Sequence, residues 1–145
     1  MAPPPRDTTT GNVLERMVGE PLRHGGYEVE RPTNPIGRRL GGGKHLVDRI
    51  AVNPKTGDTF LVSLKWQQTS GTAEQKIPFE IMCLAEAVKV SDGRYRRAYL
   101  VLGGNGWTLR KLYVEGGLSN YLKNCETVTV LDLETFVAKA NKGQL

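Results

Sequence analysis

The sequence lacks the features that mark membrane-spanning and disulfide-rich proteins. Its apolar runs are far shorter than the roughly 20 residues that a membrane-spanning helix needs, and no signal peptide is recognisable before the first expected helix. Only two cysteines occur, Cys83 and Cys125, and they form neither a disulfide framework nor a metal-ligand spacing. We therefore expect a protein of the reducing cytoplasm with no membrane partner.

Histidine and tryptophan are also scarce. His24 and His45 are far apart and lack the spacing of metal ligands. Trp66 and Trp107 are interpreted as core residues rather than as platforms for stacked bases. Positive charge is present instead: the net charge is +5 and the sequence pI is near 9.4. This balance favours a polyanionic partner.

The stretch with the clearest pattern is a predicted antiparallel hairpin. Residues 46–52 and 59–68 both alternate between apolar and polar side chains, which is typical of strands. Residues 53–58 (NPKTGD) join them with the residues of a tight turn. The pattern places Asp48 and Lys65 on neighbouring strands, above one side of a sheet whose other side is core.

The remaining chain predicts alternating helices and strands. With 145 residues and 39% hydrophobic content, it fits one domain over residues 11–145, preceded by a disordered Pro- and Thr-rich tail over residues 1–10. Thr9 or Thr10 is expected to cap the first helix, Thr72 to begin a capping box, and Asp132 to cap the last helix. The expected helices are 13–22, 77–90, 107–122 (interrupted at Gly116-Gly117) and 133–142. The further strands are 27–31, 98–102 and 127–131, and 32–43 is a loop. This order predicts an α/β fold with a mixed central sheet flanked by helices.

Asp48 and the tripeptide Ser63-Leu64-Lys65 resemble the motif of the PD-(D/E)xK nuclease superfamily. In that motif a metal-binding Asp opens one strand, and an acid-x-Lys follows on the next. Ser63 stands at the acid position here. Some restriction enzymes of the superfamily carry Ser there and take the missing carboxylate from the following helix, where this chain has Glu80. The resemblance covers residues 13–101 and implies a restriction-endonuclease-like α-β-β-β-α-β core.

The resemblance implies a divalent metal site that takes Mg²⁺, for which Mn²⁺ can substitute. Asp48 would anchor the ion, Glu80 would supply the second carboxylate, and the backbone carbonyl of Leu64 is a further candidate ligand, because Mg²⁺ prefers oxygen. Glu15 on the first helix and Glu74 compete for the role of second carboxylate. Each acid also has a structural interpretation, since acids are stabilised near helix N-termini or lie on solvated faces.

The catalytic roles follow from the chemistry of phosphodiester hydrolysis. Lys65 would position or deprotonate the attacking water and offset charge in the transition state, while Ser63 and Gln67 would hold metal-bound waters. The structural alternative for Asp48 and Lys65 is an exposed cross-strand ion pair, worth less than about 1 kcal/mol.

Two basic segments are candidate DNA contacts. Each also has a simpler interpretation, as a linker or turn made soluble by its charge. The first is the glycine-rich loop that leads into the hairpin, and the second is the turn after the helix 77–90. Their candidate residues are Arg38, Arg39, Lys44 and His45 in the first, and Arg94, Arg96 and Arg97 in the second.

The combined hypothesis is a Mg²⁺-dependent DNA endonuclease of restriction, homing or junction-resolvase type. Two strands require two active sites, so a homo-oligomer is expected. Such an enzyme would be cytoplasmic and encoded by a bacterium, an archaeon or a phage. The alternative is a non-catalytic nucleic-acid-binding module that kept the fold, with Ser63 as the sign of a lost acid.

Overall fold

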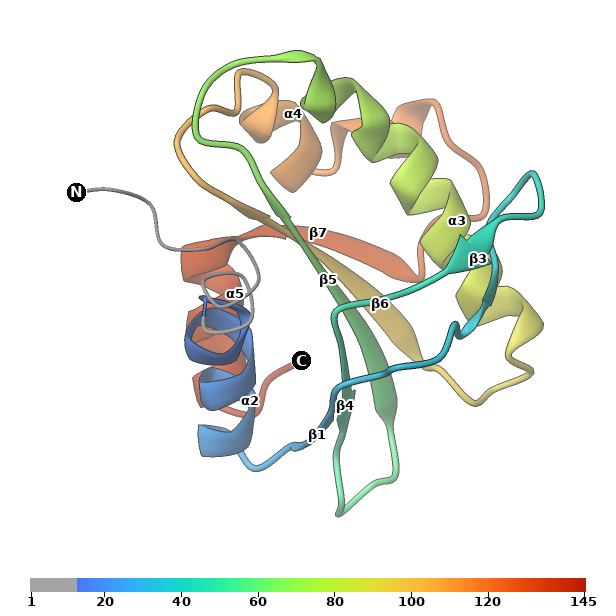
Figure 1. Cartoon of the computed structure of the whole chain (residues 1–145), viewed down its shortest axis with the longest axis vertical. Helices are drawn as coiled ribbons and strands as arrows, with labels where there is room; N and C mark the ends of the chain where they lie inside the picture. The colour runs from blue at the N-terminus through green and yellow to red at the C-terminus, as the bar shows by residue number, and fades with distance from the viewer. Residues whose placement is uncertain (1–12) are drawn as a thin grey trace.

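A computed structural model describes residues 13–145 of the chain. A twisted central sheet separates two helical layers, with α3 and α4 on one face and α2 and α5 on the other (Figure 1). The strands are β1 (Glu28–Glu30), β2 (Gly37–Arg38), β3 (Lys44–His45), β4 (Arg49–Val52), β5 (Thr59–Trp66), β6 (Arg97–Gly103) and β7 (Val128–Asp132).

The helical segments alternate with these strands. The main helices are α2 (Glu20–His24), α3 (Ile77–Val90), α4 (Arg110–Val114) and α5 (Leu133–Asn141), and the shorter turns are η1 (Glu15–Gly19), η2 (Thr72–Lys76) and η3 (Gly117–Asn120). Within residues 13–145, no helix combines the length and the apolar character needed to cross a membrane.

The main sheet has the strand order β1-β4-β5-β6-β7. Neighbouring strands are antiparallel from β1 to β5 and parallel from β5 to β7. Because parallel neighbours need a crossover connection, α3 crosses one face between β5 and β6. The predicted α/β class with a mixed, helix-flanked sheet is confirmed.

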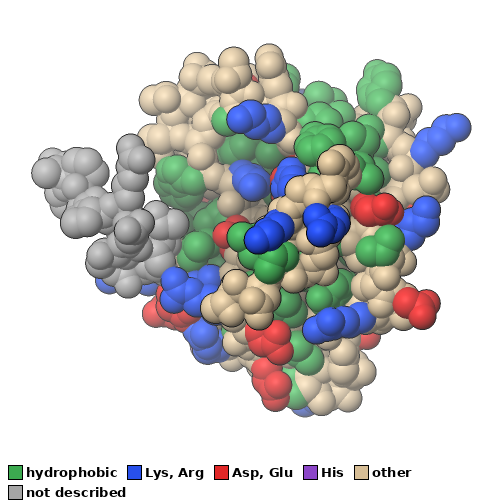
Figure 2. Space-filling view, turned by 45° about the vertical axis from the view of Figure 1, so that its right-hand side comes forward, with side chains coloured by type: hydrophobic (Ala, Val, Ile, Leu, Met, Phe, Trp, Pro, Cys, Tyr) green, Lys and Arg blue, Asp and Glu red, His purple; other side chains and the backbone are tan. Residues whose placement is uncertain are grey.

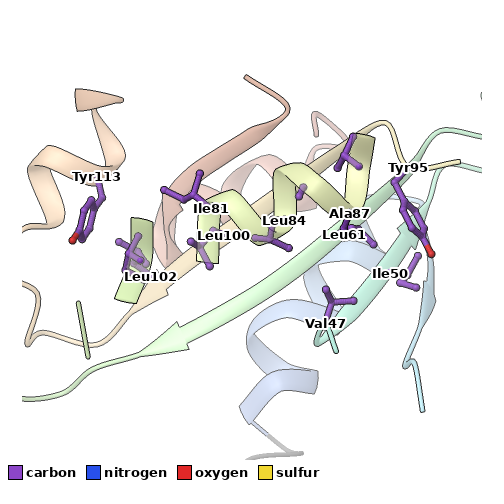
Figure 3. Packing of buried hydrophobic residues seen from close by; sticks show 13 residues of the cluster. Val47, Ile50, Leu61, Ile81, Leu84, Ala87, Tyr95, Leu100, Leu102 and Tyr113 are labelled. Atoms are coloured by element: carbon purple, nitrogen blue, oxygen red, sulfur yellow. The ribbon is translucent and has the colours of Figure 1, made fainter. Parts of the chain in front are cut away.

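The face under α3 is apolar because the helix repeats large aliphatic residues at helical spacing. Ile81 and Leu84 of α3 lie over Leu61 of β5 and Leu100 of β6, all nearly inaccessible to solvent (Figure 3). This packing fixes the helix over the strands that carry the predicted site residues.

The opposite face of the sheet, which the hairpin pattern predicted as core, is buried as well. Tyr27, Phe60, Tyr99 and Phe136 form a row of aromatic rings whose successive centroids lie 6.2, 5.9 and 6.3 Å apart. Helices α2 and α5 cover this row. The half-exposed Trp66 lies outside the core, contrary to expectation.

Three local predictions also differ from the structure. The expected loop 32–43 contains β2, which pairs with β3 as a separate two-stranded hairpin. The expected helix 107–122 is shorter than predicted, because only α4 and η3 form, and the predicted interruption lies at Gly116, whose φ of +76° favours glycine. Thr72 begins η2 without forming a capping box, because Gly71 is the N-cap and no side chain in the described part of the chain caps it.

Other local predictions are confirmed or lie outside the structure. Asp132 caps α5 by accepting a hydrogen bond from the backbone N–H of Thr135 at 2.8 Å. The predicted helix 77–90 matches α3. The predicted tail over residues 1–10, with the caps at Thr9 or Thr10, lies outside the described residues.

The close approach of α2 to α5 predicts a sensitive glycine. A Cβ at Gly25 would overlap the carbonyl oxygen of Ala140, so Gly25→Ala is expected to lower the free energy of unfolding by about 2 to 3 kcal/mol. Gly43→Ala is the control, because no described residue comes within 4 Å of its Cβ position, and its effect should stay within about 0.5 kcal/mol. Equal urea midpoints for the two variants would contradict this packing.

Candidate active site

The first part of the site is the junction of β4 and β5. Arg49 and Val62 form the last residue pair at one end of the antiparallel β4–β5 ladder, so Asp48 lies one residue outside it. Its N–H donates to the carbonyl of Val62 at 3.1 Å, and its Oδ2 accepts from the N–H of Leu64 at 2.7 Å. Both polar groups of a strand residue point to the same edge. The Leu64 carbonyl is therefore directed to the side of β5 on which Asp48 lies.

The alternation of side chains along β5 determines which of them point to the face under α3. Leu61 belongs to the apolar cluster under α3, and Ser63 and Lys65 follow at two-residue intervals, so they point to the same face. Ser63 is buried, whereas 43% of the Lys65 side chain is exposed. The predicted separation of the two faces of this strand is confirmed.

Glu80, in the first turn of α3, brings the second carboxylate to this face. Its side chain is only 7% exposed. Its Oε2 accepts a hydrogen bond from Nη2 of Arg39 at 2.9 Å. Its Oε1 lies 3.8 Å from Nε2 of His45 and 4.0 Å from Nζ of Lys65, and it has no hydrogen-bond partner among residues 13–145.

The two carboxyl groups have opposite electrostatic environments. Burial alone would raise the pKa of Glu80, but the facing imidazole and the two nearby cations stabilise its charged form and lower the pKa from 4.5 to about 2. Burial raises the pKa of Asp48, and the negative charge of Glu80 adds to this shift. The Leu64 N–H and the neighbouring cations oppose it. Lys65 stabilises the charged forms of both acids, and its Nζ lies 4.0 Å from Oε1 of Glu80.

The donors at this site fit a hard divalent cation. Asp48 and Glu80 each offer a carboxylate, one oxygen of Glu80 is buried without a hydrogen bond, and the Leu64 carbonyl points to the same side. Across residues 13–145, no three His, Cys, Asp or Glu side chains gather closely enough to hold a metal ion. An ion held by two carboxylates would therefore keep several waters, which is the usual behaviour of Mg²⁺.

Glu15 is placed away from these groups. Its carboxylate forms an ion pair with Arg23, and its Oε1 lies 3.8 Å from Nη2 of the buried Arg49. Adjacent strand residues alternate between faces, so the Arg49 side chain lies on the opposite face from that of Asp48. The structure thus brings Glu15 to two arginines and not to the other predicted ligands.

Glu74 and Gln67 form hydrogen bonds with the loop that follows β6. Glu74 is buried and accepts hydrogen bonds from the Thr108 hydroxyl and the N–H groups of Thr108 and Leu109. The Thr108 hydroxyl is the main reason that the pKa of Glu74 is lowered. The Gln67 amide donates to the carbonyl of Gly106 at 2.7 Å. These contacts give both residues a structural role at the end of β5.

The β2–β3 hairpin contains four of the predicted DNA contacts. Arg38 and Lys44 are exposed, as a phosphate contact requires. Arg39 instead turns inwards to Glu80. His45 is fully buried beside the same carboxylate, so its predicted exposure to a phosphate backbone does not match its position.

The second basic segment lies at the other end of the sheet. Arg97 pairs with Phe60, five residues before Lys65 on β5, which is a separation of roughly 17 Å along the strand. Arg97 also donates to the Glu126 carbonyl and the Thr129 hydroxyl. Arg94 and Arg96 remain exposed in the same turn.

Two residues of the site were missed as partners of Glu80. Arg39 is 41 positions from Glu80 in the chain, and His45 precedes the predicted hairpin. Neither has a spacing that relates it to α3. The sequence predicted Arg39 only as a DNA contact, because of the basic character of its loop.

A comparison with family models finds a match that covers most of the chain. A family model described as the PD-(D/E)XK nuclease superfamily domain matches residues 6–144. No curated protein and no solved structure matches the chain.

The opposite pKa shifts predict opposite effects of two amide substitutions, measured by chemical unfolding in EDTA. Glu80→Gln removes a stabilised charge and should lower the free energy of unfolding by about 2 kcal/mol at pH 7. Asp48→Asn removes a charge that burial disfavours but keeps the acceptor for Leu64, so it should raise this free energy by about 1 kcal/mol.

The pH dependence follows from the same shifts. The contribution of Glu80 is complete above its unfolded pKa of 4.5 and disappears as the pH falls towards about 2. The cost of ionising Asp48 begins above its unfolded pKa of 3.8. Both differences from the wild type should therefore shrink in acid. Destabilisation by both substitutions at pH 7 would contradict these environments.

Proposed function

Because the chain belongs to the PD-(D/E)XK nuclease superfamily, we propose that it is a Mg²⁺-dependent endonuclease that hydrolyses DNA phosphodiester bonds. The observation that carries the proposal is that Glu80 of α3 comes within 4.0 Å of Lys65 on β5, the strand whose neighbouring Leu64 N–H donates to Asp48. Glu80 comes from a helix that follows the motif, so it supplies the carboxylate that Ser63 lacks.

The proposed ion would be held by Asp48, Glu80 and the carbonyl of Leu64. A bound divalent ion lowers the pKa of water and offsets charge on a phosphate. The partly exposed ammonium of Lys65 reaches solvent beside these ligands, so it would orient the attacking water and stabilise the developing negative charge. The buried hydroxyl of Ser63 would hold a water on the same face. An all-oxygen donor set favours Mg²⁺, with Mn²⁺ as a substitute.

The proposed DNA interface is the face that contains the β2–β3 hairpin. Lys and Arg side chains are distributed over this face (Figure 2). Arg38 and Lys44 are exposed beside the site, and the turn with Arg94 and Arg96 would contact the backbone farther along the duplex. Phosphate contacts of this kind position a protein without reading sequence.

A homo-oligomer is part of the proposal. One chain offers one site, and cutting both strands of a duplex requires two sites related by symmetry. A symmetric oligomer of a chain of this size would suit a restriction enzyme, a small homing endonuclease or a junction resolvase.

A second candidate function is non-catalytic nucleic-acid binding. Two observations favour it. Ser63 replaces the acid of the motif, and Arg39 donates a hydrogen bond to the carboxylate of Glu80. In this case the site would bind a phosphate backbone without cleaving it.

Incubation of supercoiled plasmid and branched DNA with Mg²⁺ distinguishes the two functions. The wild type should nick or linearise DNA, and Asp48→Ala, Lys65→Ala and Glu80→Gln should each lower the rate by at least about 100-fold. Glu86→Gln is the matched control, because Glu86 lies on α3 but takes part in none of the site contacts described above. It should cleave at the wild-type rate.

The outcomes separate the candidates as follows. Binding without cleavage by the wild type, seen as a gel shift of the same DNA, would favour the non-catalytic module. Cleavage that persists in Asp48→Ala would place the chemistry elsewhere in the chain.

A further inference from the structure

The ion pair between Arg39 and Glu80 occupies a carboxylate that the proposed metal ion requires. Nη2 of Arg39 lies 2.9 Å from Oε2 of Glu80, which is a direct, charge-assisted hydrogen bond. The Glu80 side chain is 7% exposed, whereas that of Arg39 is 29% exposed. Arg39 therefore reaches the acid from the solvent side and covers it.

The charges at the site are balanced while Arg39 is in place. The two carboxylates of Asp48 and Glu80 face two cationic groups, those of Arg39 and Lys65. A divalent cation entering this neutral group would gain little net attraction. With Arg39 removed, the remaining three side chains have a net charge of −1 and attract a divalent cation. Arg39 and the ion are thus competitors for Glu80.

The segment that carries Arg39 is a short turn at the surface. Arg39 directly follows β2, and Gly41 and Gly42 lie in the loop between β2 and β3 with φ of +95° and +99°. No described residue comes within 4 Å of the Cβ positions of these glycines. The guanidinium lies 5.5 Å from the ring centroid of the exposed Phe79. Arg39 thus approaches Glu80 from a loop at the surface, and the positive charge that it removes on leaving would be replaced by that of the ion.

We infer that Arg39 exchanges partners during substrate binding, from the Glu80 carboxylate to a phosphate of the nucleic acid. This inference rests on the proposed metal-dependent function. In the resting state Arg39 neutralises Glu80. When the ion binds Glu80, the guanidinium is released beside the site, next to the exposed Arg38 and Lys44, where a phosphate replaces the carboxylate as its partner.

The exchange makes metal binding and nucleic-acid binding cooperative. The ion and the phosphate both favour the state in which Arg39 has left Glu80, so each strengthens the binding of the other. Without nucleic acid the ion binds weakly. The site would therefore hold its metal ion mainly when nucleic acid is also bound.

The competition is tested by titrating Mn²⁺ alone into the protein by calorimetry. Arg39→Ala should bind Mn²⁺ about tenfold more tightly than the wild type, which is within the usual range of coupling between sites. Arg38→Ala removes the same charge from the same hairpin, but Arg38 donates to the Gly42 carbonyl instead of Glu80. Its Mn²⁺ affinity should stay within about twofold of the wild type, because exposed charges are screened.

The exchange itself is tested by fluorescence anisotropy with labelled duplex DNA. All proteins carry Lys65→Ala so that the DNA stays intact. In Mn²⁺, Arg39→Ala should weaken DNA binding several-fold. In EDTA, where Arg39 remains on Glu80, the same substitution should have no effect. Arg38→Ala should weaken binding equally in both conditions.

The outcomes separate this inference from the proposed function. If Asp48→Ala abolishes Mn²⁺ binding while Arg39→Ala leaves the affinity unchanged or lower, the metal site stands and the exchange is wrong. If Arg39→Ala weakens DNA binding equally with and without Mn²⁺, Arg39 is an ordinary phosphate contact and the exchange is again wrong. If Asp48→Ala binds Mn²⁺ as tightly as the wild type, the proposed metal site fails as well. Thermal unfolding of each variant confirms that it is folded.

Discussion

A buried negative charge at Glu80 is the constraint on which the site depends. A carboxylate removed from water must be matched by positive charge or by a metal ion, because an unpaired buried charge costs several kcal/mol. In this structure Arg39 donates a hydrogen bond directly to the acid, and Lys65 and His45 lie nearby. The position of the β2–β3 hairpin is therefore linked to the charge of an acid on α3. A cation that binds Glu80 in place of Arg39 would therefore also change the contacts of the hairpin.

The sheet provides the fixed part of the site. The β4–β5 register holds Asp48 against the backbone of Leu64, and alternation along β5 turns Ser63 and Lys65 to the same face. The crossover between β5 and β6 places α3 over this face, so Glu80 meets the strands at the first turn of the helix. Both faces of the sheet are buried, which gives these elements little freedom to shift. The β2–β3 hairpin adds Arg39 to this framework, and in the proposed exchange its guanidinium is the group that changes partner.

Local periodicity was sufficient to predict the elements that form this fixed part. The two alternating runs identified β4 and β5, and the apolar stripe of residues 77–90 identified α3 at its observed bounds. The resemblance to the superfamily then related Glu80 to Asp48 by its place in the chain. In the segment 107–122 the glycine pair at residues 116 and 117 predicted the interruption that the structure shows between α4 and η3.

The contacts of Glu80 could not be predicted in this way. The pairing of β2 with β3 involves two residues on each strand, which is too short for a periodic signal. Arg39 meets Glu80 only because this hairpin folds over α3, and the burial of His45 has the same origin. Such contacts depend on tertiary packing between segments 35 or more residues apart, as the 41-residue separation of Arg39 and Glu80 illustrates. A sequence pattern shows the charge of such residues but not their partners.

The central claim is that Asp48 and Glu80 hold one ion. The most direct test is the anomalous diffraction of crystals of the protein soaked in Mn²⁺. We expect a single anomalous peak within about 2.5 Å of one carboxylate oxygen of each residue. The Arg39 guanidinium should no longer be bonded to Glu80. A peak bound to other residues, or no peak while Arg39 remains on Glu80 at saturating Mn²⁺, would contradict it.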